Sequence, residues 1–170
     1  MVAALEATQA LTKPAGGLIP TFKSQDVLWL ALLQAKYKQD PKGGRMDYMQ
    51  HPQVMWNAAK TLTPGGDCED YAVAGAASLY RSNLAPRIWL LSTQWAGDNR
   101  RLEGHSICVW EDMIGQMWQA SNWGGPRKVL NLWAAAMGVN HRALAALALP
   151  VAAVRAGTGV VTFDQPFRVV

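Results

Sequence analysis

The chain has 170 residues, of which 50% are hydrophobic and 16% are charged. This length allows one domain with a proper core, and the composition excludes an intrinsically disordered chain. The formal net charge is +4, but the basic residues are scattered, without the basic stripe interleaved with aromatic residues that is typical of nucleic-acid binding. We therefore expect a single domain over residues 1–170 that has no nucleic-acid partner.

Two segments bear on targeting and membrane insertion. The N-terminal stretch MVAALEATQALTKPAGG has no basic region, and polar residues interrupt its apolar part, so it is a poor secretion signal. The longest apolar segment, residues 143–154, contains Pro150 and is shorter than the roughly 20 residues that a bilayer requires. These features predict no membrane partner and favour a cytoplasmic or assembly-associated location. Such a setting also favours free thiols at Cys68 and Cys108 over a disulfide.

The first half of the chain is predicted to be helical. A short helix is expected over residues 1–13. Ser24 is a good N-cap for a buried helix over residues 25–38, where strand alternation is absent and the turn sequence DPKGG follows. A second helix is expected over residues 52–61, with a proline in its first turn. A third begins at Cys68, and its many small residues allow close packing, so we expect it to be the central helix.

The second half is predicted to be richer in strands. Alternating patterns predict an antiparallel sheet, and a β-rich tail is expected to close the chain. Between them, two segments have the composition of helices. The expected strands cover residues 86–94, 104–111 and 115–122, the partly helical segments are residues 127–138 and 141–149, and the β-rich tail covers residues 158–170.

Cys68 is the first candidate for chemistry. The start of a helix presents unpaired N–H groups and a positive dipole end, which favour a thiolate. Three carboxylates, Asp67, Glu69 and Asp70, flank the sulfur and disfavour that charge. Two simpler interpretations stay open: Cys68 is a small buried apolar residue, and the acids are an N-cap and a negatively charged first turn.

His105 and Asn122 are the candidate partners of Cys68. His105 follows a glycine on a predicted strand, and Asn122 lies on the next one. Because side chains alternate along a strand, Cys108 points away from His105 and is expected to fill the core. An asparagine side chain can accept the Nδ1 proton of histidine and hold the imidazole in the useful tautomer. These residues predict a Cys-His-Asn triad.

Three motifs together resemble a known family. GDCEDYA at 66–72, the glycine-histidine pair at 104–105 and W-x-x-x-N at 118–122 are similar to those of bacterial transglutaminase-like cysteine peptidases, within the papain-like and transglutaminase-like fold group. The resemblance covers roughly residues 47–124. It implies an α+β fold with the nucleophile helix packed on an antiparallel sheet. It also implies Cys68 as nucleophile, His105 as base and acid, and Asn122 in a position usually held by aspartate.

The resemblance implies a cysteine-dependent amide hydrolase, a peptidase that acts on a protein or peptide through a thioester. Two alternatives stay open: transglutaminase-type acyl transfer, and a catalytically silent module of a larger assembly such as a phage particle. No cofactor is required, but calcium dependence in some relatives makes Asp67 and Glu69 candidate calcium ligands. His51 and His141 lack neighbours at metal-ligand spacing, so no zinc site is predicted.

Aromatic residues and one loop suggest where a substrate would bind. Most of the eight tryptophans are expected in the core. Trp123, next to Asn122, is a candidate shield for the His-Asn hydrogen bond, and Trp56 and Trp95 are candidates to line a cleft. The polar segment 95–104 leads into His105, so we expect it to contact substrate.

Overall fold

The structure is a computed structural model that describes residues 19–39, 51–98, 101–155 and 159–170. The helix expected over residues 1–13 lies outside these ranges. Within them the fold is α+β, as predicted. The helices are α2 (Gln25–Leu32), α3 (Pro52–Thr61), α4 (Cys68–Arg81) and α5 (Leu132–Val139). The strands are β1 (Arg87–Ala96), β2 (Leu102–Glu111), β3 (Met117–Ser121), β4 (Gly124–Val129), β5 (Ala145–Val154), β6 (Val161–Phe163) and β7 (Phe167–Arg168).

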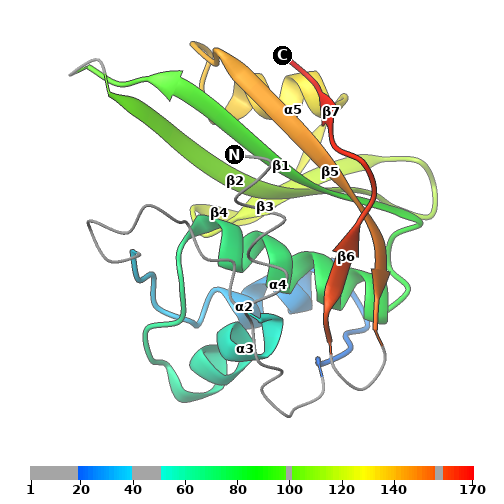
Figure 1. The fold of residues 1–170 in the computed structure, drawn as a ribbon. Coiled ribbons are helices and arrows are strands. Elements are labelled where there is room, and N and C mark those ends of the chain that lie inside the picture. The colour runs from blue at the N-terminus through cyan, green and yellow to red at the C-terminus, as the bar shows by residue number, and fades with distance from the viewer. Residues whose placement is uncertain (1–18, 40–50, 99–100, 156–158) are drawn as a thin grey trace.

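One sheet divides the molecule into layers (Figure 1). Its strand order is β4-β3-β2-β1-β5-β6, with β7 also paired to β5, and each of these pairs is antiparallel. Helices α2, α3 and α4 cover one face, and α5 covers the other. The helix that begins with Cys68 therefore packs on an antiparallel sheet.

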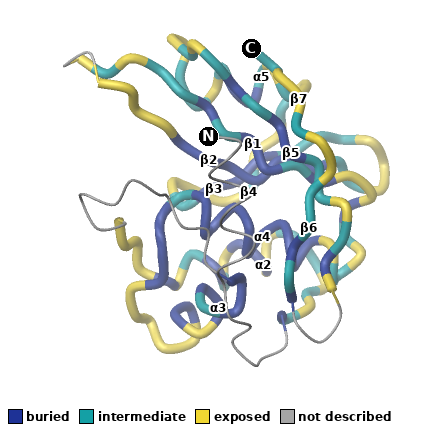
Figure 2. Tube along the Cα trace, viewed as in Figure 1, coloured by how far each residue is buried: buried dark blue, intermediate teal, exposed yellow. Residues whose placement is uncertain are grey.

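Helix α4 is the centre of the larger core. Its residues from Glu69 to Leu79 are all buried, and it packs against β2, β1, α2 and α3 (Figure 2). Small side chains make this possible, since a helix buried on all sides needs close approach by every neighbour. The smaller core on the opposite face of the sheet joins Leu91 and Ile107 to Ala135 and Ala136 of α5.

Local signals place most of the helix starts. The Ser24 side chain accepts a hydrogen bond from the N–H of Val27, which confirms the N-cap of α2. The second helix, α3, has the predicted bounds, and α4 begins at Cys68. Helix α2 ends at Leu32, earlier than expected, because the following residues bond to the loop before α4 through contacts such as Lys36 N–H to the Thr63 carbonyl, 3.0 Å.

The prediction of a helix over residues 141–149 is wrong. In the segment 127–138, the helix prediction is right only for the residues that belong to α5. Residues 124–129 form β4, and residues 145–154 form β5. The sequence AALAL has high helix propensity, but β5 pairs with β1 on one side and with β6 and β7 on the other. Burial between strands overrides that propensity. The β-rich tail is confirmed by β6 and β7.

Gly75 allows a close contact in the larger core. A Cβ atom at this position would lie 2.4 Å from Cη2 of Trp29, whose side chain is fully buried. We expect Gly75→Ala to lower the free energy of unfolding by about 1–3 kcal/mol, because the added methyl would force the fully buried indole to shift. Urea denaturation measures the difference. Gly138→Ala in α5 is the matched control, since its Cβ would meet only the end of the Arg127 side chain, at 3.3 Å. Equal stability changes in the two variants would contradict the close contact.

Candidate active site

Cys68 is the first residue of α4, and the helix start is capped by its own sequence. Asp67 is the N-cap, and the Asp70 carboxylate accepts a hydrogen bond from the Asp67 N–H at 3.2 Å. A Cβ on Gly66 would lie 1.9 Å from Oδ2 of Asp70, so glycine is required there. The expectation that Asp67 and Asp70 serve the helix start is confirmed.

The loop before Cys68 is fixed by the segment that follows α2. The N–H of Gly65 donates to the Lys36 carbonyl, and the Gly66 carbonyl accepts from the Lys38 N–H, both at 2.9 Å. One turn into α4, the Tyr71 hydroxyl donates to the carbonyl of Ala35. These bonds hold the start of α4 at a fixed place beside the sheet.

The sulfur of Cys68 lies between a carboxylate and the edge of β2. The thiol donates to Oε2 of Glu69 at 3.1 Å, and Sγ accepts from the backbone N–H of Ser106 at 3.4 Å. Strand β3 pairs with β2 only from Cys108 to Glu111, so the edge of β2 at Ser106 is left for the sulfur. Since Ser106 directly follows His105, the structure brings the nucleophile candidate to the histidine's own strand.

Burial and the nearby acids keep Cys68 protonated. Burial is the largest effect that raises the pKa of the Cys68 thiol, and the Glu69 carboxylate adds to it. The hydrogen bond from Ser106 acts in the opposite direction but is outweighed. Without substrate the group is a thiol at neutral pH, although it sits at a helix N-terminus.

His105 is buried against an aromatic ring. It is 4% exposed, and its imidazole stacks on the Trp123 indole with ring centroids 3.5 Å apart and planes 4° apart. Burial lowers the pKa of His105 to about 4, so the imidazole is neutral at pH 7. Trp123 is itself 63% exposed and covers the imidazole from the solvent side. A shielding role for Trp123 was expected, and the group it contacts is the imidazole.

Asn122 lies in the turn between β3 and β4 rather than on a strand. Its Oδ1 atom and Nε2 of His105 are both buried without a hydrogen-bond partner. The expected hydrogen bond from His105 to Asn122 is therefore not formed in this structure. The thiol of Cys68 is bonded to Glu69 rather than to the imidazole. The three candidates come from neighbouring elements, but no hydrogen bond joins them.

Thr93 is a neighbour of His105 that the sequence did not reveal. The two residues are opposite each other in the β1–β2 register, so their side chains share the α5 face of the sheet. Thr93 is fully buried, and its hydroxyl also lacks a hydrogen-bond partner. Only the strand register, which a single sequence does not give, pairs Thr93 with His105. Cys108, as expected, lies on the other face in the larger core.

The candidate calcium ligands are already engaged. Asp67 caps α4, and Glu69 accepts the thiol hydrogen bond. Calcium takes six to eight oxygen ligands, whereas the described residues contain no group of three or more acids, histidines or cysteines suited to a metal. Calcium binding at Asp67 and Glu69 stays a prediction.

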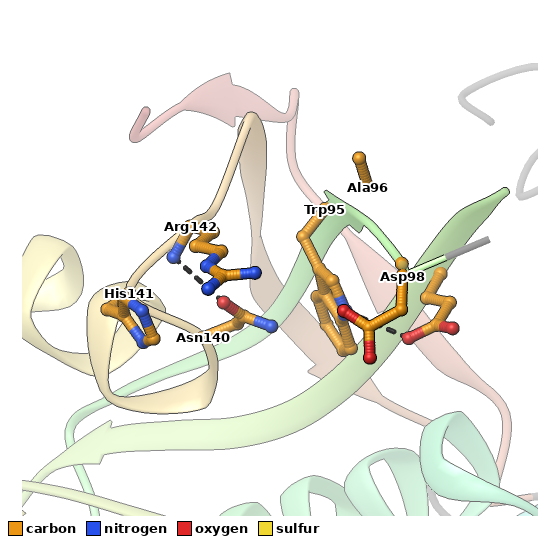
Figure 3. A pocket seen from close by; sticks show the side chains of 8 residues that line it. Trp95, Ala96, Asp98, Asn140, His141 and Arg142 are labelled. Carbon is orange, nitrogen blue, oxygen red and sulfur yellow. Dashed lines mark hydrogen bonds between the residues drawn. The ribbon is translucent and has the colours of Figure 1, made fainter. Parts of the chain in front are cut away.

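A cavity of about 310 Å³ adjoins the stacked pair on the α5 face of the sheet. Its walls include Ile107, Ser121 and Trp123, and the end of α5 closes it at Gly138 and Val139. The expectation that Trp56 lines a cleft is wrong, because its side chain is 2% exposed within the larger core. The described residues of segment 95–104 lie at the adjoining ends of β1 and β2, and Trp95 lines a second cavity there (Figure 3).

Comparisons with known proteins add no identification: no family model matches the chain, and no curated protein matches it. None of the helices in the described ranges is long and apolar enough to cross a membrane.

The buried neutral His105 predicts a pH-dependent stability. Its pKa falls from an ordinary value of 6.5 to about 4, so the unfolded chain binds the proton more readily. The neutral, buried imidazole stabilises the folded state fully above about pH 6.5. As the pH falls towards 4 this contribution is lost, which lowers the free energy of unfolding by up to about 3 kcal/mol. We expect the free energy of unfolding to drop more between pH 7 and pH 4.5 in the wild type than in His105→Gln. His141→Gln, at an exposed site, should behave like the wild type; parallel curves for all three proteins would refute the prediction.

The Glu69 carboxylate predicts a second effect. Glu69→Gln removes a negative charge beside the thiol, so the pKa of Cys68 should fall and its alkylation should accelerate. Each unit of lowering raises the thiolate fraction about tenfold while the thiol form dominates. Peptide mass spectrometry after iodoacetamide treatment at pH 8 measures the rate at Cys68, and buried Cys108 should stay unlabelled. Asp164→Asn, an exposed acid elsewhere, is the control. An unchanged Cys68 rate in Glu69→Gln would show that the carboxylate does not control the thiol.

Proposed function

We propose that the chain is a cysteine-dependent amide hydrolase of the papain-like and transglutaminase-like fold group, with Cys68 as nucleophile and His105 as base. The observation that carries the proposal is the position of the Cys68 sulfur, 3.4 Å from the backbone nitrogen of Ser106, the residue after His105. Thiol catalysis needs a base within reach of the nucleophile, and this contact brings the sulfur to the strand that bears His105. A protein or peptide is the proposed substrate, with no metal in the chemical step.

The reaction would begin with the thiol turning from Glu69 towards His105. As the sulfur attacks the amide carbonyl, the unpartnered Nε2 of His105 takes the thiol proton. The backbone N–H of Cys68 donates to the developing oxyanion. The C–N bond then breaks, the imidazolium protonates the leaving amine, and a thioester remains. Water resolves the thioester with His105 again as base, which restores the thiol and releases the acid.

Asn122 is proposed to orient the imidazole during these steps. Its Oδ1 is buried and unpartnered, so it is available to accept the Nδ1 proton of His105 after a small movement of the β3–β4 turn. That bond would leave Nε2 as the proton acceptor. The flat contact with Trp123 would keep the ring from rotating and exclude water from the bond.

Acylation by an activated ester tests the proposal directly. With p-nitrophenyl acetate we expect a burst of nitrophenol and an acetyl group on Cys68, located by mass spectrometry. His105→Ala should slow acylation at least about 100-fold, because a positioned base contributes a factor of this size. Cys108→Ala and His141→Ala are the controls and should acylate at the wild-type rate. Equal rates in His105→Ala and the wild type would refute the role of His105 and with it the proposed mechanism.

A catalytically silent module with the same fold is the second candidate. The observation in its favour is the bond between the Cys68 thiol and Glu69, together with the raised pKa that burial and this carboxylate cause. A module of this kind would show no burst. Its Cys68 would be alkylated more slowly than a free thiol, with or without His105.

A further inference from the structure

A second cavity, of about 330 Å³, lies at the end of the β1–β2 hairpin. Figure 3 shows its two walls: the hairpin carries Trp95 and Asp98, and the loop after α5 carries Asn140, His141 and Arg142 opposite them. The size is that of a pocket for a small ligand or for one or two residues of a peptide.

The two walls carry opposite charges. Asp98 and Glu103 place carboxylates on the hairpin wall, and Arg142 places a guanidinium on the loop wall. No salt bridge joins Asp98, Glu103 and Arg142 to one another. A ligand that bears both an ammonium and a carboxylate can satisfy both walls at once, whereas a ligand of one charge sign is repelled by one of them.

Trp95 gives the pocket an aromatic surface. Its indole N–H donates to Oε2 of Glu103 at 3.0 Å, which fixes the ring between the walls. The loop wall is also ordered, because the Asn140 side chain accepts from the N–H of Arg142 at 2.8 Å. An aromatic face next to carboxylates favours an ammonium group, and the guanidinium across the cavity favours a carboxylate.

The pocket lies on the same face of the sheet as the side chain of His105. Every second side chain of β2 from Glu103 to Ile107 points to the α5 face of the sheet. Glu103 lines this cavity, His105 stacks on Trp123, and Ile107 lines the first cavity. The opposite wall is continuous as well, since residues 138–139 line the first cavity and residues 140–142 line the second. The two cavities therefore lie on the same face of the sheet, and their β2 residues Glu103 and Ile107 flank His105.

We propose that the hairpin pocket binds a free amino-acid head group, with its ammonium and carboxylate, of a lysine-type residue whose side-chain amide is the bond to be broken. Glu103 and His105 are two residues apart on an extended strand, about 7 Å. A four-carbon side chain reaches about 6 Å from Cα to its terminal nitrogen. A head group held by the hairpin pocket therefore presents the side-chain amide beside His105, and the substrate class is an isopeptide. The assignment of the amide as the bond that is hydrolysed rests on the proposed function; the binding of the head group does not.

Binding of Nε-acetyl-lysine tests the proposal without requiring catalysis. This probe has a free head group and a side-chain amide. In a titration followed by nitrogen-15 NMR, the indole N–H of Trp95, assigned with Trp95→Phe, should shift to saturation. A probe with the α-amine acetylated and the carboxyl amidated should bind at least about tenfold more weakly, since it loses the charges that both walls recognise. Equal affinity for the two probes would overturn the proposal.

Variants of the two walls sharpen the test. Asp98→Asn and Arg142→Gln should each weaken binding about two- to fivefold, the range expected for exposed charged contacts. Arg155→Gln, an exposed arginine outside the cavity, should bind like the wild type. Unchanged affinity in Arg142→Gln would also overturn the proposal.

Two measurements separate this proposal from the proposed function. The titration in Cys68→Ala measures head-group binding where Cys68 cannot react, and the activated-ester assay measures acylation of wild-type Cys68. Saturable binding without acylation of wild-type Cys68 by the activated ester would leave the head-group site standing and refute catalysis. Acylation at Cys68 without head-group binding would do the reverse. If both hold, the wild type should release lysine and acetate from Nε-acetyl-lysine with consumption of one water, and Cys68→Ala should not.

Discussion

The contact between the Cys68 sulfur and the Ser106 N–H links the helical layer to the sheet at the point where chemistry is proposed. Two independent features allow it. Strand β3 stops at Ser121 and leaves the edge of β2 uncovered, and the capped start of α4 directs the sulfur to that edge. A longer β3 would use the same N–H for a ladder hydrogen bond and displace the thiol. The shortness of β3 is therefore as important to the candidate site as the residues of the proposed triad.

Burial sets the charge state of both candidate catalytic groups. It raises the pKa of the Cys68 thiol and lowers the pKa of His105 to about 4, so both groups are neutral at pH 7. Proton transfer from this thiol to this imidazole is uphill unless the developing charges are stabilised. The N-terminus of α4 can stabilise the negative charge on sulfur and on the oxyanion, but the Glu69 carboxylate opposes both. The balance between these two neighbours of the sulfur separates an active hydrolase from a silent module.

Local signals in the sequence predicted the parts of the fold that depend on local interactions. The N-caps Ser24 and Asp67 marked two helix starts, and alternation located β1, β2 and β3. Strand β5 was mistaken for a helix because its alanines and leucines favour a helix until β1 and β6 flank them. Pairing between strands was also beyond the sequence, so the position of Thr93 opposite His105 was not foreseen. Trp56 was wrongly placed in a cleft, since nothing local separates a core tryptophan from one in a cleft.

The proposed nucleophile and the two cavities are bounded by different parts of the chain. Cys68 is held from the α4 side of the sheet, through the caps of α4 and the bonds of Lys36 and Lys38 to its loop. Both cavities lie on the α5 side and share one wall, residues 138–142. A change in the length of this wall would alter both cavities without touching the thiol. His105 links both sides of the sheet, since its backbone neighbour binds the sulfur and its side chain stacks on Trp123 on the α5 face. For the proposed hydrolase, changes in the loop after α5 would therefore alter the substrate range while the position of the sulfur is retained.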